Sequence, residues 1–282
     1  MKRILITGAN SYVGTSFENY VKQWPDKYQV DTISLYGEAW REKSFAGYDV
    51  ILHVAGIAHV KETRKNAHLY FQVNRDLAIE TANKAKRDGV KQFIFLSSMS
   101  VYGMETGVIN RNTIPYPKSN YGKSKLEAEK EINKLSDQLF YVAIVRPPMI
   151  YGKNCRGNFR LLIQAIDKTP VFPLCQNQRS MIYIKNFCSF LIYIIENRST
   201  NIYLPQNLEY MQTSQMAYWI SKARGKSIHM SVLIGFLVRI LRIFLPIAKK
   251  SFGTLIYKDR EGIEELYCMY NLEKSIEESV KY

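Results

Sequence analysis

The alternation of short apolar runs with longer helical segments restricts the fold of this chain more than any other feature. The runs have the length of strands and lie at residues 4–6, 29–35, 49–56, 92–98 and 140–145. Helical segments lie between most of them, at residues 15–23, 69–88 and 121–136. Nearly continuous apolar runs are typical of strands that helices cover on both faces. We therefore predict an α/β fold, a Rossmann-like doubly wound parallel sheet.

The chain has 282 residues, enough for one large domain or two modest ones. The alternation becomes less regular in the final third. We expect a first domain over residues 1–165, which also uses residues 181–197, and a smaller C-terminal α/β part over residues 166–282.

The formal net charge of +14 favours anionic partners, such as nucleotide diphosphates, nucleic acid or an acidic membrane surface. The lysines and arginines are dispersed, so we expect no nucleic-acid partner. Four scattered cysteines, with no Cys-x-x-Cys spacing, predict no metal site and reduced thiols. An apolar strand begins at once after the N-terminus, unlike a signal peptide, so we expect a cytoplasmic protein.

A glycine-bearing turn follows the first apolar run and precedes a helix. In Thr7-Gly8-x-x-Ser11-x-x-Gly14, Gly8 permits a tight turn, and the helix N-terminus offers free N–H groups to a pyrophosphate. Gly14 allows close packing of helix and strand, while Ser11 replaces the usual middle glycine. We expect NAD or NADP here, in contact with Gly8, Ser11, Tyr12, Val13 and Gly14. The alternative is an ordinary turn.

Near the end of the second apolar run, dinucleotide-binding folds often carry an acidic residue that bonds the adenosine ribose, and this chain has Ser34 there. With no carboxylate there, Arg41 and Lys43 could pair with a 2′-phosphate, which favours NADP slightly over NAD. Solvated loop charges are the alternative. Two further positions are expected near the cofactor: the small Ala55-Gly56 pair after the third run, and Asn74, which could bond backbone there or lie on a helix surface.

Tyr121 and Lys125 are four residues apart and share one face of a predicted helix. A lysine ammonium beside a phenol lowers the phenol pKa, and such a tyrosine can move a proton to or from a sugar oxygen. Ser98, at the end of the fourth run, could hold the same oxygen. By itself, this spacing is weak evidence for a catalytic pair, because it also occurs on solvated helix faces.

Residues 232–248 are very apolar but contain Arg239 and Arg242. Because these arginines and the following Pro246 interrupt the apolar run, we expect no membrane span here. We expect either a helix packed inside the small domain or at a subunit contact, or a basic amphipathic segment of residues 232–250 that touches a membrane surface.

Taken together, these motifs resemble the extended short-chain dehydrogenase/reductase family, in its nucleotide-sugar epimerase/dehydratase branch. Six motifs carry the resemblance, in order: Thr7-Gly8-x-x-Ser11-x-x-Gly14, His53-x-Ala55-Gly56, Asn74, Ser97-Ser98-x-x-Val101-Tyr102-Gly103, Tyr121-x-x-x-Lys125 and Arg146-Pro147-x-x-Ile150-Tyr151-Gly152. The resemblance covers nearly the whole chain and is strongest over residues 1–190.

The resemblance implies an enzyme that binds NAD(P) and a nucleoside-diphosphate sugar, most simply a UDP-sugar of surface-polysaccharide synthesis, and that forms a homodimer. It implies that Tyr121 is the acid/base, that Lys125 bonds the nicotinamide ribose and that Ser98 orients the reacting oxygen. Ser97 and Pro148 are then expected at the cofactor. Ser98, Met99, Ser100, Asn158 and Arg179 are expected at the substrate.

Three reactions fit this family. Its dehydratases resemble one another in carrying Asp-Glu where this chain has Met99 and Ser100, which supply neither acid nor base, so a dehydratase is not expected. A 4-ketoreductase of a UDP-(N-acetyl)-deoxyhexulose is the first expectation, because Ser34 and the short connection to Asp49 suit an exchanging cofactor. A UDP-hexose 4-epimerase with retained NAD is the alternative, and a non-catalytic dinucleotide-binding regulator is a minor one.

Overall fold

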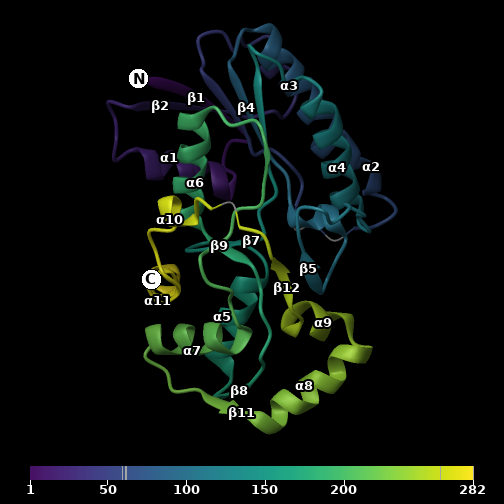
Figure 1. Ribbon diagram of the computed structural model, residues 1–282, viewed down its shortest axis with the longest axis vertical. Coiled ribbons are helices and arrows are strands. Elements are labelled where there is room, and N and C mark those ends of the chain that lie inside the picture. Colours follow the sequence, from purple (N-terminus) through teal and green to yellow (C-terminus); the bar gives the residue numbers. More distant parts are fainter. Residues whose placement is uncertain (59, 61, 261, 282) are drawn as a thin grey trace. The chain divides into compact units, whose positions relative to one another are not determined.

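The computed structural model describes residues 1–58, 60, 62–260 and 262–281, and its residues form two compact units (Figure 1). Unit 1 comprises residues 1–103, 114–147 and 188–205. Unit 2 comprises residues 104–113, 148–187 and 206–282. The chain thus passes between the units several times. The expected division at residues 165 and 166 stays a prediction about binding domains, because these units are defined by compactness alone.

Unit 1 is built on a six-stranded parallel sheet with the strand order β10-β6-β4-β3-β1-β2. The strands are β1 (Lys2–Thr7), β2 (Tyr28–Ile33), β3 (Val50–His53), β4 (Gln92–Leu96), β6 (Tyr141–Val145) and β10 (Ile202–Tyr203). All five neighbouring pairs are parallel. The predicted doubly wound α/β fold is therefore confirmed.

The helices of unit 1 follow the predicted segments with shifted ends. They are α1 (Tyr12–Val21), α2 (Ala67–Phe71), α3 (Leu77–Arg87), α4 (Asn120–Asn133) and most of α6 (Ile184–Asn197), with short turns η1 (Ala39–Arg41) and η3 (Met99–Tyr102). The segment predicted as one helix at residues 69–88 contains a π-helical turn, η2 (Gln72–Asp76), between α2 and α3. Such turns often occur at functional sites.

The core of unit 1 lies between the sheet and its helices. Leu5, Ile51, Phe93 and Val142 occupy neighbouring strands and are fully buried. Alanines at residues 78, 82 and 85 of α3 are also fully buried, so this helix approaches the sheet closely. Burial on both faces explains why the strands are apolar throughout.

The strand order places a switch point at β1. From β1 the chain moves outward to β2, and then returns past β1 to β3 on the other side. The connection from Ser34 to Asp49 contains only η1 and no further strand of this sheet among the described residues. In open parallel sheets, ligands bind where the order reverses, outside the carboxyl ends of the strands. That point lies between Thr7 and His53, the paired last residues of β1 and β3.

Unit 2 contains three two-stranded parallel pairs and several helices. The strands are β5 (Gly107–Ile109) with β12 (Leu255–Tyr257), β7 (Met149–Tyr151) with β9 (Met181–Tyr183), and β8 (Val171–Pro173) with β11 (His229–Ser231). The helices are α5 (Asn158–Lys168), the first residues of α6, α7 (Thr213–Ala223), α8 (Val232–Phe244), α9 (Pro246–Phe252), α10 (Glu264–Tyr267) and α11 (Leu272–Val280).

The apolar segment at residues 232–248 is not one continuous helix. Its first helix, α8, ends at Phe244. The second helix, α9, begins after Leu245, whose backbone is extended. The residue before a proline is restricted to such a conformation, which explains the break before Pro246. Over the described residues, no helix combines the length and apolar character that a membrane crossing requires.

Candidate active site

The glycine turn brings the backbones of β1 and β3 into contact at the switch point. Gly8 has a φ of 98°, and a Cβ at this position would lie 2.8 Å from the Cα atom of Ala55. A side chain is therefore excluded both by conformation and by space. Gly14 is also closely packed, with Ile6 of β1 3.0 Å from a hypothetical Cβ. Because Gly8 has no side chain, none covers the N-terminus of α1 from this position.

Ser11, which replaces the usual middle glycine, is the N-cap of α1. Its Oγ accepts a hydrogen bond from the backbone N–H of Gly14 at 3.1 Å. Serine is a favoured N-cap because it satisfies a free helix N–H in this way. Tyr12 and Val13 form the first turn of α1, and Val13 is buried. The turn fits a pyrophosphate, whose charge the positive end of the helix dipole stabilises.

Asn74 lies in the π-helical turn and is fully buried. Its Oδ1 accepts from the N–H of Ile57 at 2.7 Å, and its Nδ2 donates to the carbonyl of Ile57 at 3.1 Å. Nδ2 also donates to Ser124 Oγ at 3.3 Å. The amide thus fixes the backbone that follows Gly56 and joins it to α4. The backbone bond considered from sequence is present, and a cofactor contact stays a prediction.

The two side chains expected at the adenosine ribose, Ser34 and Arg41, already have partners within the chain. Ser34 Oγ accepts from the N–H of Tyr36 at 3.2 Å. Arg41 forms ion pairs with Glu38 and Glu80, and the hydrogen bond to Glu80 raises the pKa of Arg41. The guanidinium is therefore already neutralised by two carboxylates. Whether Arg41 meets a 2′-phosphate stays a prediction.

Ser98 and Tyr121 are brought together by different elements of unit 1. Ser98 follows β4 and is the N-cap of η3, where its Oγ accepts from the N–H of Ser100 at 3.1 Å. Tyr121 stands in the first turn of α4, and its phenol is hydrogen-bonded to Ser98. Met99 and Ser100, expected at the substrate, lie on η3 beside this pair. A sugar hydroxyl placed at Ser98 would therefore also meet the phenol.

Burial raises the pKa of Tyr121 above its ordinary value, although the hydrogen bond to Ser98 opposes this effect. The net lowering of the Tyr121 pKa that was expected is therefore absent for these side chains by themselves, and the effect of Lys125 on Tyr121 stays a prediction. A low-dielectric environment disfavours the phenolate more than the hydroxyl of Ser98 stabilises it. The phenol is protonated at neutral pH and can donate a proton.

Lys125 is 4% exposed and donates from Nζ to the carbonyl of Leu96 at 2.8 Å. The ammonium also lies over the ring of Phe95, 4.6 Å from its centroid. Burial lowers the pKa of Lys125 to about 8, although the charge of Glu129 opposes this shift. A hypothetical Cβ on Gly56 would lie 3.4 Å from Nζ, so this glycine leaves space beside the ammonium.

A buried ion pair that the sequence analysis did not identify supports α4. Arg146 donates to both carboxylate oxygens of Glu129, from Nη2 at 2.6 Å and from Nε at 2.9 Å, and Nη1 donates to Tyr102 Oη at 2.9 Å. Both side chains are less than 10% exposed. The hydroxyl of Ser97, which was expected at the cofactor, donates to Glu129, and its role at the cofactor stays a prediction. The sequence did contain a signal for this ion pair: Glu129 lies four residues after Lys125 on the same predicted helix, and Arg146 begins the Arg-Pro motif.

Glu62 is a second residue that the sequence analysis missed. Its carboxylate accepts from the backbone N–H groups of Asn120 at 3.1 Å and Tyr121 at 3.0 Å. A carboxylate stabilises a helix N-terminus by satisfying its free N–H groups. Glu62 therefore fixes the end of α4 that carries Tyr121. Its position in a polar loop far from α4 in sequence gave no signal.

Three expected site residues belong to unit 2. Pro148 is buried at the start of its segment 148–187, and Asn158 is the exposed first residue of α5. Arg179 donates from Nη1 to the carbonyls of Lys250 and Gly253, both at 2.9 Å, and burial lowers its pKa. Their roles at cofactor and substrate stay predictions.

Comparisons with known proteins identify the family of this chain. The sequence profile of the "NAD dependent epimerase/dehydratase family" matches residues 4–204. The chain belongs to this family. It is 26% identical over 89% of its length to UDP-glucose 4-epimerase of Vibrio cholerae, of which it covers 90%.

A second relative, from Escherichia coli O157:H7, is N-acetyl-alpha-D-glucosaminyl-diphospho-ditrans,octacis-undecaprenol 4-epimerase. The identity is 28% over 69% of this chain and 63% of the relative. The fold is similar to that of UDP-glucuronic acid 4-epimerase from Bacillus cereus in complex with NAD, with a TM-score of 0.75, 18% identity and coverage of 99% and 95% of the two chains. The protein is thus an enzyme of the nucleotide-sugar epimerase/reductase type.

Proposed function

We propose that the protein transfers hydride at C4 of a sugar carried on a nucleoside diphosphate, and that 4-epimerisation is its reaction. The observation that supports hydride transfer most is the constellation of Ser98, Tyr121 and Lys125 at the carboxyl end of β4. The two relatives described above are 4-epimerases, which favours epimerisation over the 4-ketoreduction expected first from sequence.

In this proposal Ser98 holds O4 of the sugar, and Tyr121 moves the proton at that oxygen. NAD, which the Gly8 turn and the residues around it would hold, would supply the hydride chemistry at C4. Lys125 is buried behind the Ala55-Gly56 turn and favours anionic forms of nearby oxygens when it is charged. The Gly8 turn and the α1 N-terminus hold the pyrophosphate. The residues present fit such a dinucleotide.

We propose NAD rather than NADP, contrary to the slight preference taken from the sequence. Glu38 and Glu80 beside Arg41 would repel a 2′-phosphate. Breaking these ion pairs would leave both carboxylates unpaired.

A 4-ketoreductase is the second candidate, and one observation favours it. Reduction of a keto sugar needs a protonated Tyr121 at the outset, whereas oxidation of a hydroxyl needs the phenolate. The raised pKa of Tyr121 supports the protonated form. An epimerase must therefore lower that pKa when its site is filled, through the positive charges of Lys125 and of the nicotinamide ring.

The test measures the dinucleotide released from purified, denatured protein by mass spectrometry, followed by assays with soluble sugar nucleotides. Retained NAD and interconversion of UDP-hexoses without net oxidation support the epimerase. Protein that consumes added NADH or NADPH only with a 4-keto sugar nucleotide supports the reductase. Protein that binds no dinucleotide refutes both.

A further inference from the structure

We propose that α8 and α9 of unit 2 form a membrane-docking surface, in which the apolar face of α8 enters an anionic bilayer and a basic pocket binds a lipid phosphate. This inference does not depend on the proposed function. It joins two observations: an exposed apolar helix face, and a cluster of cations next to it.

The apolar face of α8 is formed by Leu233, Leu237, Ile240 and Phe244, whose spacing places them on one side of the helix. They are 71%, 51%, 40% and 73% exposed, respectively. Phe236 and Leu241 adjoin them and are also exposed. Single exposed apolar residues are ordinary, but a contiguous set on one helix marks an interaction site.

The opposite side of α8 packs against unit 2. Gly235 approaches the end of β8 so closely that a Cβ would lie 2.1 Å from the carbonyl oxygen of Leu174. Arg239 and Arg242 follow at four and seven residues from Gly235 and therefore share its side. Arg242 donates to the carbonyl of Phe252 at 2.9 Å, which joins α8 to α9. The apolar face is thus held outward by packing on the other side.

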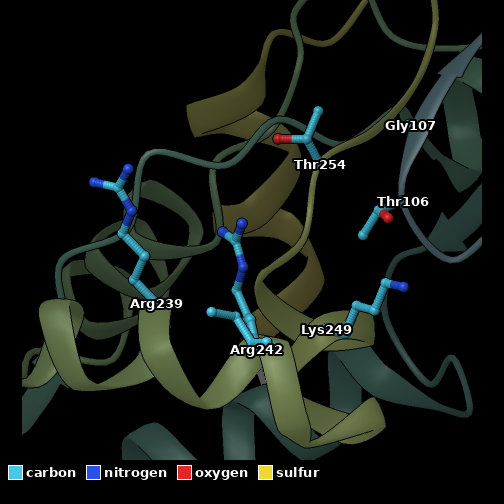
Figure 2. A pocket seen from close by; sticks show the side chains of 7 residues that line it. Thr106, Gly107, Arg239, Arg242, Lys249 and Thr254 are labelled. Atoms are coloured by element: carbon cyan, nitrogen blue, oxygen red, sulfur yellow. The ribbon is translucent and has the colours of Figure 1, made fainter.

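The basic side of α8 lines a cavity of about 270 Å³ within unit 2. Its walls are formed by Thr106, Gly107, Arg239, Arg242, Ile243, Lys249 and Thr254. Figure 2 shows the guanidinium group of Arg242 rising from α8 toward Thr254, that of Arg239 extending away to the left, and Thr106 and Lys249 on the other flank. Within the part of the chain that the structure describes, no ion pair joins these three cations to a carboxylate. Three cations and hydroxyl groups suit a phosphate.

The charge of the surrounding sequence favours a bilayer over a protein partner. Residues 210–258 contain eight lysines and arginines and no aspartate or glutamate. Lys222, Arg224 and Lys226 pair with Glu273 or Asp167, so the attraction to anionic lipid headgroups comes mainly from the cations of α8 and α9. A second copy of the chain is a poor occupant, because a two-fold contact through the apolar face would leave the cations on the opposite side of α8 without an anionic partner. An interfacial helix with an apolar face and flanking cations is the usual form of such an anchor.

The experiment is sedimentation of the full chain with vesicles of phosphatidylcholine, with and without phosphatidylglycerol. We expect the wild type to sediment with the anionic vesicles, and less at high salt because exposed charges are screened. In the variant Leu237→Glu/Phe244→Glu, binding should fall at least tenfold, because charges replace the inserted residues. In Arg239→Gln/Lys249→Gln, it should fall about thirtyfold.

Matched controls carry the same changes elsewhere. Leu139→Glu alters an exposed leucine of unit 1, and Arg87→Gln/Lys130→Gln removes two exposed cations of unit 1. Both should bind vesicles like the wild type. All variants should keep the circular dichroism spectrum and the turnover of a soluble sugar nucleotide, so that a failure of the proposed function is recognised separately.

Several results would overturn the proposal. Equal binding of the wild type to anionic and neutral vesicles would do so, as would binding of both α8 variants at the wild-type level. Conversion of a dimer to a monomer by the apolar variant, with no form binding vesicles, would identify a second copy as the occupant. A raised KM for the soluble substrate in Arg239→Gln/Lys249→Gln, with unchanged vesicle binding, would assign the pocket to substrate. Full displacement by inorganic phosphate at constant ionic strength would assign it to free phosphate.

Discussion

In the proposed reaction the hydroxyl of Tyr121 moves the proton, so its removal would separate catalysis from cofactor binding. We expect Tyr121→Phe to lower kcat by about 10²–10⁴-fold, because proton transfer by a positioned side chain contributes that much. Dinucleotide affinity should change little, since the ring remains and only the oxygen is lost. The measurement is steady-state turnover together with dinucleotide binding by calorimetry. Tyr116→Phe, at an exposed tyrosine, is the control. Unchanged turnover in Tyr121→Phe would instead support the regulator.

Lys125 makes stability depend on pH in a defined window. Its pKa is about 8 in the folded protein and 10.5 when solvated, so between these values the unfolded chain binds more protons. The penalty of burying the charge is full below about pH 8 and disappears as pH rises to 10.5. Relative to Lys125→Met, the wild type should therefore gain about 3 kcal/mol between pH 7 and pH 10.5.

The measurement is urea unfolding of both proteins at several pH values in the absence of dinucleotide. The exposed Lys130→Met serves as control and should show no such relative change. A difference between wild type and Lys125→Met that stays constant with pH would contradict the buried, destabilised ammonium.

At the scale of elements, the ion pair between Glu129 and Arg146 connects α4 to the end of β6. Removing one partner leaves a buried charge unpaired, so Glu129→Gln or Arg146→Met should each lower the free energy of unfolding by about 3–5 kcal/mol. The double variant Glu129→Met/Arg146→Met should recover much of this loss, because no charge remains buried. A double-mutant cycle of urea unfolding measures the coupling. Glu131→Gln, at an exposed ion pair with Lys134, should change stability by less than about 1 kcal/mol.

The glycine turn between β1 and α1 can be tested with a matched pair of substitutions. Gly8 and Gly89 both have positive φ, 98° and 78°, but only Gly8 has backbone atoms within contact of a Cβ. Gly89→Ala should therefore lower the free energy of unfolding by about 1 kcal/mol, because only the positive φ disfavours alanine there. Gly8→Ala should cost more and should also abolish dinucleotide binding, because Ala55 must move. Equal stability losses in the two variants, with binding retained, would contradict the close approach of β1 and β3.

For the whole molecule, ligand binding provides a test of cofactor choice. A dinucleotide at about 100 times its Kd should stabilise the folded protein by about 2.7 kcal/mol, which is visible as a rise in Tm. NAD should raise the Tm more than NADP at the same concentration, because Glu38 and Glu80 already occupy Arg41. In Glu80→Gln this preference should weaken, since one carboxylate is removed and the guanidinium is partly released. A larger shift with NADP in the wild type would restore the preference inferred from sequence.

The sequence predicted the parts of the fold that depend on local patterns. Apolar runs of strand length, separated by helical segments, predicted the parallel sheet, and the glycine spacing predicted the turn between β1 and α1. The capping role of Ser11 and the interruption of the helix at Asn74 were not predicted. Both depend on which hydrogen-bond partners the tertiary structure supplies.

The helical spacing of apolar residues also could not distinguish a buried helix from an exposed one. In α6, Phe187, Leu191 and Ile194 repeat at helical spacing and are fully buried, whereas in α8 Leu233, Leu237 and Ile240 repeat similarly and are exposed. The sequence by itself therefore determined the class of fold, the family and the candidate chemistry, because these follow from local spacing and residue type. Only the tertiary structure decided the strand order, the partners of Arg41, Glu129 and Lys125, and the exposure of α8. These depend on contacts between residues that are distant in the chain, and no local pattern specifies them.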